Sequence, residues 1–204
     1  MKLHDSIGPN PRVVRMAIAE KGLAVETVKV DLMAGENRQP DYMAKVPTGS
    51  LPGLELDDGR CISEITAIVE YLEDVHPGRP VIGSTAEERA ETRMWTRRID
   101  LAIIEPMTTA FRAAEGRGLF ASRMALVSAE AAADLKTMAQ QKLLWLDGQM
   151  QGRTWVCGDR YTLADILLLA FVEFGASVGQ PAPEGATWIA AWHERAAARP
   201  SSAA

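Results

Sequence analysis

The chain has little cysteine, no surplus of positive charge and no long apolar run. Cys61 and Cys157 are its two cysteines and form no C-x-x-C pair, which excludes a dithiol redox centre and a cysteine zinc site. The three histidines are scattered without ligand spacing, so we expect no metal. The net charge is −5, whereas proteins that bind nucleic acid phosphates are usually positively charged. No segment approaches the ~20 apolar residues of a membrane span.

The composition is that of a globular protein of one or two domains. Of its 204 residues, 47% are hydrophobic and 24% are charged. The first ten residues contain no apolar core of the kind that signal peptides carry. We therefore expect a cytoplasmic protein that has neither a membrane nor a nucleic acid as its partner.

Strand and helix patterns alternate over residues 1–77. The pattern of the first half is strand, helix, strand, and that of the second half is strand, strand, helix. This order predicts an α/β domain of the thioredoxin-like type. The helix that begins near Ile65 has Ser63 as its expected N-cap. Strands are predicted at 2–5, 25–30, 54–56 and 60–62, and the first helix at 12–21.

The chain changes character after residue 77. A linker is predicted at residues 78–83, because the segment 76–80 contains two prolines and a glycine. Residues 84–204 predict an all-α helical bundle. Thr162 and Asp165 have the spacing of a capping box, which predicts the start of a buried helix. The bundle helices are expected at 85–104, 123–148, 163–174 and 188–198.

Three motifs of the chain resemble those of the cytosolic glutathione S-transferase family. The resemblance is to a bacterial-type member of that family. Residues 49–54 (GSLPGL) match the segment that enters the third strand through a cis-proline. Residues 63–72 (SEITAIVEYL) match the start of the helix that binds glutathione. Residues 158–165 (GDRYTLAD) match the buried capping segment. The resemblance covers essentially the whole chain.

The resemblance implies a glutathione transferase, in which the glutathione thiolate attacks a small hydrophobic electrophile. Glutathione would be the co-substrate, no metal would be needed, and the protein would be a homodimer. In this family the backbone before the cis-proline pairs with the extended tripeptide, which assigns that role to Leu51 and Pro52.

Other residues would hold the ends of glutathione. The N–H groups at the start of the helix after Glu64 suit the γ-glutamyl carboxylate, and the Glu64 side chain suits the ammonium. The family usually has serine where this chain has Ile65, so the Ile65 N–H remains without a neighbouring hydroxyl. Gln39 and Lys45 lie in the loop expected to face the glycine carboxylate.

Catalysis requires a donor that keeps the thiol ionised. By alignment on the first helix, the serine of the serine-type classes falls on Gly8 and the cysteine of the cysteine-type class on Asn10. Asn10 and Ser6 are then the candidate catalytic donors. An asparagine amide stabilises a thiolate but accepts no proton. Asn10 also fits a plain turn position between two prolines.

Two other functions use the same scaffold. One is a non-catalytic protein that binds glutathione or another ligand, which the departures at Gly8 and Ile65 would permit. The other is a glutathione-dependent reductase or isomerase. Thioredoxin and glutaredoxin chemistry is disfavoured because no cysteine stands at the start of the first helix.

Overall fold

The computed structural model describes residues 1–204 and divides into two compact units. The first unit comprises Met1–Ser84 together with Arg199–Ala204, and the second comprises Thr85–Ala198. No helix in the chain combines the length and apolarity needed to span a bilayer.

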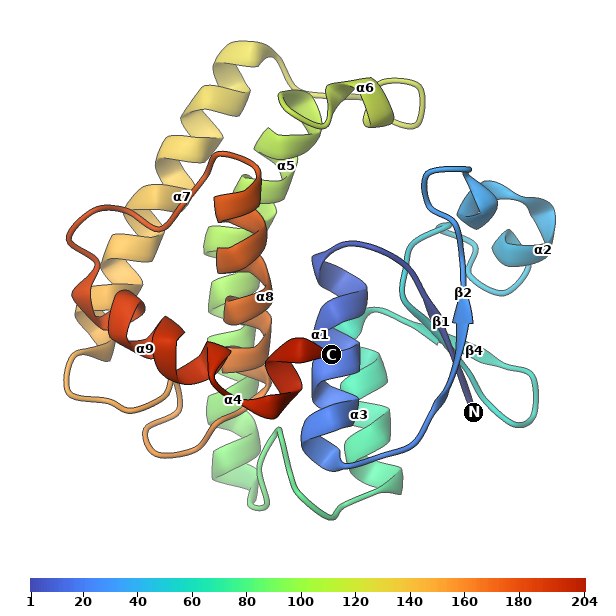
Figure 1. Ribbon diagram of the computed structural model, residues 1–204, viewed down its shortest axis with the longest axis horizontal. Helices are drawn as coiled ribbons and strands as arrows, with labels where there is room; N and C mark the ends of the chain where they lie inside the picture. Colours follow the sequence, from blue (N-terminus) through green and yellow to red (C-terminus); the bar gives the residue numbers. More distant parts are fainter. The chain divides into compact units, whose positions relative to one another are not determined.

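A four-stranded mixed sheet forms the centre of the first unit. The strands lie in the order β2-β1-β3-β4, with β1 parallel to β2 and β3 antiparallel to both of its neighbours (Figure 1). This arrangement confirms the predicted thioredoxin-like α/β class. The strands are β1 (Lys2–Asp5), β2 (Glu26–Lys29), β3 (Gly53–Glu55) and β4 (Cys61–Ser63).

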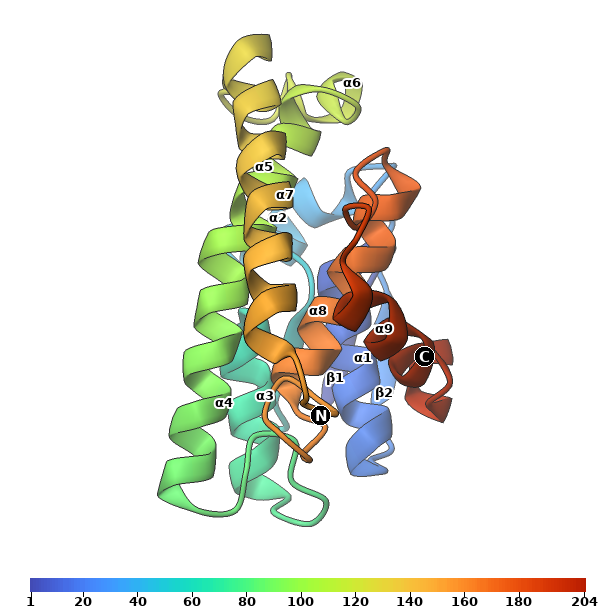
Figure 2. The ribbon, with the colours of Figure 1, turned by 90° about the vertical axis from the view of Figure 1, so that its left-hand side faces the viewer.

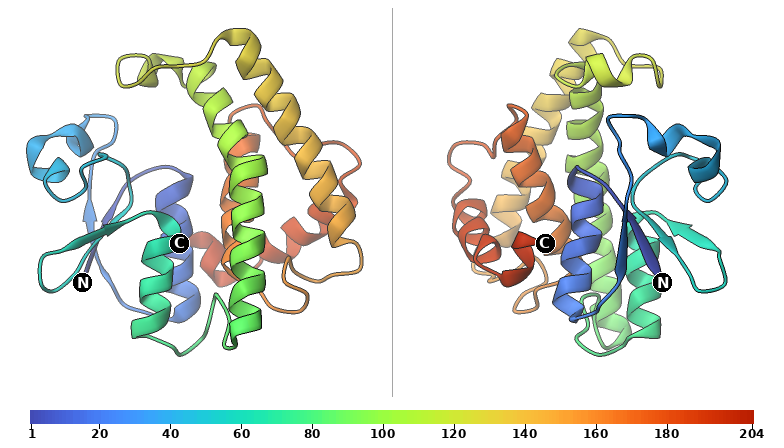
Figure 3. Two further views of the ribbon diagram at one scale, coloured as in Figure 1. Left: turned by 180° about the vertical axis from the view of Figure 1, so that it is seen from behind. Right: turned by 45° about the vertical axis from the view of Figure 1, so that its right-hand side comes forward.

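Different helical segments pack on the two faces of the sheet. Helices α1 (Pro9–Lys21) and α3 (Ile65–Val75) lie side by side on one face (Figure 3). Their buried residues, with Leu3 and Leu54 of the strands, make the core of this side. Because side chains alternate along a strand, His4 points to the opposite face, where it meets Tyr42. That face carries η1 (Glu36–Arg38) and α2 (Pro40–Met43).

The starts of α1 and α3 differ from the sequence prediction. Helix α1 begins at Pro9 rather than at residue 12, since Pro9 is favoured at a first helical position and Gly8 adopts the φ of +110° that precedes it. Ser63 is not the N-cap of α3, because it pairs with Gly53 as the last residue of β4. Glu64 takes the N-cap position instead.

The linker and the C-terminal tail both belong to the first unit. The buried carboxylate of Glu73 accepts hydrogen bonds from the backbone N–H groups of Val81 and Ile82. In the tail, which ends in η3 (Pro200–Ala203), Arg199 makes two hydrogen bonds to Glu20 on α1. Figure 1 marks the C-terminus beside α1. The division therefore differs from the expected domains, 1–77 and 84–204, by the linker and the tail.

The second unit is all-helical, as predicted. Helices α4 (Ala86–Ile99) and α5 (Glu105–Ala113) continue one another through a π-helical turn, η2 (Asp100–Ile104) (Figures 1 and 2). Pro106 has no N–H, which interrupts the regular ladder at this point. The remaining helices are α6 (Arg117–Phe120), α7 (Ala129–Met150), α8 (Leu163–Ser177) and α9 (Thr187–Ala197).

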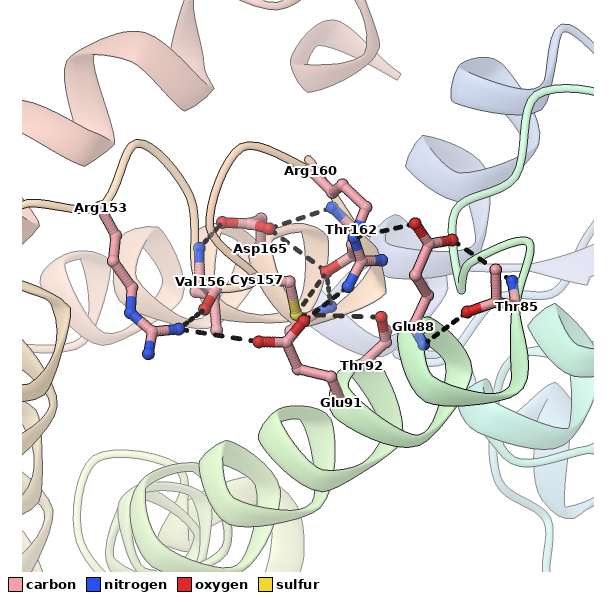
Figure 4. A network of polar contacts seen from close by, with 11 residues as sticks. Thr85, Glu88, Glu91, Thr92, Arg153, Val156, Cys157, Arg160, Thr162 and Asp165 are labelled. Carbon is pink, nitrogen blue, oxygen red and sulfur yellow. Dashed lines mark hydrogen bonds and ion pairs between the residues drawn. The ribbon is translucent and has the colours of Figure 1, made fainter.

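Helix α8 is the buried centre of this unit, and its start confirms the predicted capping box. The Thr162 N–H donates to the Asp165 carboxylate at 3.0 Å. Asp165 is fully buried and also accepts from the Val156 N–H and the Trp192 indole. Figure 4 shows Asp165 in a larger polar network that includes Cys157. These contacts give Asp165 a structural role at the start of α8.

Candidate functional site

The candidate site lies at one end of the sheet in the first unit. His4 of β1 pairs with Gly53 of β3, which in turn pairs with Ser63 of β4. Beyond this row, β1 runs toward the start of α1, β3 is preceded by Leu51 and Pro52, and β4 runs into Glu64. The register therefore gathers three of the predicted segments at the same end of the sheet.

The backbone N–H and C=O groups of Leu51 are unpaired at this end of the sheet. Its peptide bond to Pro52 is cis, as the family motif implied. Neither the N–H nor the C=O of Leu51 makes a hydrogen bond within the chain. Pro52 is buried, and Leu51 is half-buried. An extended peptide ligand can therefore pair with the Leu51 backbone as an added strand would.

The start of α3 offers free donors beside a free carboxylate. The first backbone hydrogen bond of this helix is donated by Ile68 to the Glu64 carbonyl, which leaves the N–H groups of Ile65, Thr66 and Ala67 unpaired. The Glu64 side chain is exposed and has no partner in the chain. Donors at a helix start suit an anion, and the carboxylate suits a cation.

Glu64 adopts a backbone conformation that disfavours a side chain. Its φ is +72°, in a region that non-glycine residues rarely occupy. Strain of this kind costs on the order of 1–3 kcal/mol and is concentrated at functional sites. The sequence motif gave no sign of this strain, because the expected N-cap was the preceding residue.

The two candidate donors to the thiol have different surroundings. Asn10 is the second residue of α1, with an exposed side chain that has no partner in the chain. Since Pro9 and Pro11 lack an N–H, the Asn10 backbone N–H is the free donor of the first turn. Ser6 is buried, and its hydroxyl donates to the Val30 carbonyl at 2.6 Å. The Ser6 hydroxyl therefore already donates its proton to a hydrogen bond within the chain.

The two residues proposed for the glycine end also differ. Gln39 is exposed, and its side chain has no partner in the chain. The Lys45 ammonium lies 2.5 Å from the Glu55 carboxylate, which also bonds His4. Hydrogen bonds from Lys45 and His4 lower the pKa of Glu55 to about 2. Lys45 is therefore directed to Glu55, the last residue of β3, and not to the end of the sheet where Leu51 lies.

No cluster of three or more histidine, cysteine, aspartate or glutamate side chains is arranged to hold a metal ion.

Comparison with known proteins decides the family. Residues 1–74 match the family model of the glutathione S-transferase N-terminal domain, and residues 104–200 match that of the C-terminal domain. The chain is 34% identical to glutathione S-transferase 2 of Saccharomyces cerevisiae, over 98% of this chain and 87% of the yeast protein. The chain belongs to the glutathione S-transferase family.

Two further relatives extend this result. Glutathione S-transferase GstA of Escherichia coli O157:H7 is 29% identical, over 98% of this chain and 94% of that protein. The crystal structure of a glutathione S-transferase domain-containing protein from Marinobacter aquaeolei VT8 matches with a TM-score of 0.92 and 37% identity. That match covers 98% of this chain and 99% of the other.

One part of the candidate site was missed from the sequence. The loop before Leu51 is held by the side chains of Asn37 and Tyr42, which donate to the carbonyls of Gly49 and Ser50. Neither residue belongs to the motifs that carried the resemblance. The apolar spacing of Tyr42 and Val46, four residues apart, is a signal of burial but not of a role at the site.

Proposed function

We propose that this protein is a glutathione transferase that conjugates the glutathione thiolate to small hydrophobic electrophiles. The observation that carries the proposal is the free backbone of Leu51 at the same sheet end as the free N–H groups of α3. A backbone acceptor and donor next to an anion-binding helix start match a peptide that ends in a carboxylate.

Each part of glutathione then has a partner. The cysteinyl backbone pairs with Leu51, beside Pro52. The γ-glutamyl carboxylate accepts from the N–H groups that begin with Ile65, and the ammonium lies against Glu64. The glycine carboxylate faces the loop that carries Gln39, and Lys45 contributes only if glutathione draws it from Glu55.

Asn10 stabilises the thiolate in this proposal. A thiol of ordinary pKa, ~8.5, is only a few per cent ionised at neutral pH. The Asn10 amide and backbone N–H donate to the sulfur, which favours its ionised form. The thiol proton goes to water. The sulfur then forms a bond to the electrophilic carbon, and the leaving group, such as chloride, departs with the bonding electron pair.

Calorimetric titration with glutathione, followed by turnover of a chromogenic chlorinated nitroaromatic, tests the proposal. We expect saturable binding and glutathione-dependent release of chloride. Glu64→Ala should weaken glutathione binding about tenfold or more, since one charge-assisted hydrogen bond is lost. Binding without turnover would identify a non-catalytic glutathione-binding protein instead. Absence of glutathione binding would exclude the transferase function and also the reductase or isomerase function.

We also propose that the protein is a homodimer. Four large apolar side chains of the second unit are exposed on the neighbouring elements α4, η2 and α7, namely Met94, Leu101, Leu144 and Trp145. Large exposed apolar side chains on neighbouring elements favour a protein interface in this region. Sedimentation should show a dimer, and Leu101→Arg should shift it toward monomer. A monomeric parent protein would overturn the assignment.

A further inference from the structure

Three successive carbonyls of the loop before Leu51 are held by side chains. Arg38 donates to the Thr48 carbonyl at 3.3 Å. Asn37 donates through its amide nitrogen to the Gly49 carbonyl at 2.7 Å. Tyr42 donates through its hydroxyl to the Ser50 carbonyl at 2.7 Å. All three donors come from the segment η1–α2, on the opposite side of the sheet from α1 and α3.

The donors of the last two bonds are buried. Asn37 is 3% exposed and Tyr42 is 7% exposed. The Tyr42 ring packs with Val30 and Val46 and meets the His4 ring edge-on. Burial raises the pKa of the Tyr42 hydroxyl, so that it remains a donor at any physiological pH. The bond from Asn37 is buried and the bond from Tyr42 is partly buried, and hydrogen bonds that are shielded from water hold their two groups in a fixed geometry.

The neighbouring glycines allow this close fit. Gly49 has a φ of +62°, and a side-chain carbon at this position would lie 2.9 Å from the Asn37 carbonyl. Gly53 is equally crowded, since a side-chain carbon there would meet Val46 at 2.9 Å and the Tyr42 hydroxyl at 3.4 Å. The loop backbone therefore lies directly on the segment that holds it.

The bond from Tyr42 has a consequence for Leu51. The Ser50 carbonyl and the Leu51 N–H belong to one planar peptide group. Apart from the cis bond between Leu51 and Pro52, no peptide bond of the chain is cis, so in this group the C=O and N–H point in opposite directions. A donor that fixes the carbonyl therefore fixes the direction of the free Leu51 N–H.

We propose that Tyr42, supported by Asn37, is a positioning residue for glutathione, because its hydroxyl orients the peptide group whose N–H pairs with the ligand. This inference rests on the proposed function of the Leu51 backbone. Tyr42 itself touches neither the ligand nor the reacting atoms. Its loss should weaken the binding of glutathione and leave the chemical step of the bound complex nearly unchanged.

Tyr42→Phe tests the proposal, with Tyr71→Phe as the matched control. Tyr42→Phe keeps the ring that packs against His4 and removes only the hydroxyl. Tyr71 is a partly exposed tyrosine of α3 whose hydroxyl has no hydrogen-bond partner in the chain. We expect Tyr42→Phe to raise the KM and Kd for glutathione about five- to tenfold, with kcat at saturation within about twofold. Tyr71→Phe should leave all three constants within about twofold.

A second readout does not depend on glutathione. In the free protein, nuclear magnetic resonance should show a shifted or broadened Leu51 amide signal in Tyr42→Phe and an unchanged signal in Tyr71→Phe. Should Tyr42→Phe not fold, Asn37→Ser should give the same change at Leu51 to a smaller extent.

The outcomes separate the two proposals. If the parent protein binds no glutathione, the proposed function fails, while the Leu51 signal still decides whether Tyr42 orients this peptide group. An unchanged Leu51 signal in Tyr42→Phe, or a Kd for glutathione equal to that of the parent, would overturn the positioning role. A loss of kcat equal to the loss in kcat/KM would also contradict it.

Discussion

Asn10 combines two donors at the start of α1, its side-chain amide and its backbone N–H. Pro9 and Pro11 lack an N–H, so Asn10 supplies the unpaired backbone donor of the first turn. The positive end of the α1 dipole adds to the effect of this donor on an anion. The proposed thiolate therefore has a single side chain whose alteration tests the mechanism.

We predict that Asn10→Ala raises the pKa of the bound glutathione thiol and that Asn10→Asp raises it further. The alanine loses one donor, whereas the aspartate places a negative charge beside the sulfur. Absorbance of the thiolate in the complex, measured against pH, gives both values. The aspartate should also favour helix α1 slightly, because it is an anion in the first turn. Thiol pKa values equal to that of the parent would remove Asn10 from the mechanism.

Glu55 provides a prediction on pH. Its pKa in the folded protein is about 2, below the ordinary glutamate value of about 4.3, because Lys45 and His4 bond its carboxylate. A lowered pKa stabilises the folded state above pH of about 4.3, and this stabilisation is lost as the pH falls toward 2. Because the ion pair with Lys45 is screened by solvent, the stabilisation amounts to about 0.2–1 kcal/mol.

The measurement is the free energy of unfolding of the parent and of Glu55→Gln between about pH 2 and 6. The parent should be more stable at the upper end, and the difference should shrink through the acid range. A difference that stays constant with pH would show that the ion pair with Lys45 does not form in solution.

Local motifs in the sequence point to a group of candidate site residues, but they do not reveal the contacts that those residues make with distant segments. Leu51, Pro52, Glu64 and Ile65 lie at the same end of the sheet, because the strand register brings their segments together, and their role in binding stays a prediction. Lys45 is held by Glu55, and Ser6 by the Val30 carbonyl. These partners become neighbours only when the strands pair, so no local pattern reveals them.

At the scale of elements, the linker after α3 is fastened by a buried ion pair. Lys21 of α1 lies 2.6 Å from Glu73 of α3, and neither side chain is appreciably exposed. Glu73 also accepts from the backbone of Val81 and Ile82. One carboxylate thus ties two helices and the linker together.

We predict that Glu73→Gln lowers the free energy of unfolding by about 3–5 kcal/mol, since it leaves the Lys21 ammonium buried without its counter-charge. Lys21→Met combined with Glu73→Gln should recover part of this loss, because the uncompensated charge is gone. Urea unfolding of the parent, both single variants and the double variant completes the cycle. Strictly additive losses would show that the two charges are not coupled.

Element boundaries followed from the sequence only in part. The class of each strand and of the long helices is as predicted, because apolar periodicity is a strong local signal. Helix α7 begins at Ala129 rather than near residue 123, since Ser128 caps it by accepting from the Ala131 N–H. Serine is a preferred N-cap residue, so Ser128 is a local signal of this boundary.

At the scale of the whole molecule, the chain returns to its first unit at the end. Arg199 bonds Glu20, and the Arg12 guanidinium donates to the Ser202 carbonyl. The tail thereby covers α1, the helix whose start carries Asn10. This return of the tail to α1 could not be predicted from the sequence, because the tail follows a predicted helix and contains no motif.

Removal of residues 199–204 should therefore loosen α1. We expect faster amide hydrogen exchange in α1 and a loss of about 1–3 kcal/mol in the stability of the first unit, from the charge-assisted bonds to Glu20. Hydrogen exchange of the truncated and parent proteins checks this, with α7 of the second unit as the internal control. Equal exchange in α1 would contradict a stabilising role for the tail.

In the proposed function, glutathione pairs with the backbone at the end of the first unit's sheet. Titration of the isotopically labelled full chain with glutathione, followed by amide nuclear magnetic resonance, tests it most directly. We predict saturating shifts at the Leu51 N–H, at the first three N–H groups of α3 and at Asn10. Shifts absent from these amides, or confined to other parts of the molecule, would contradict it.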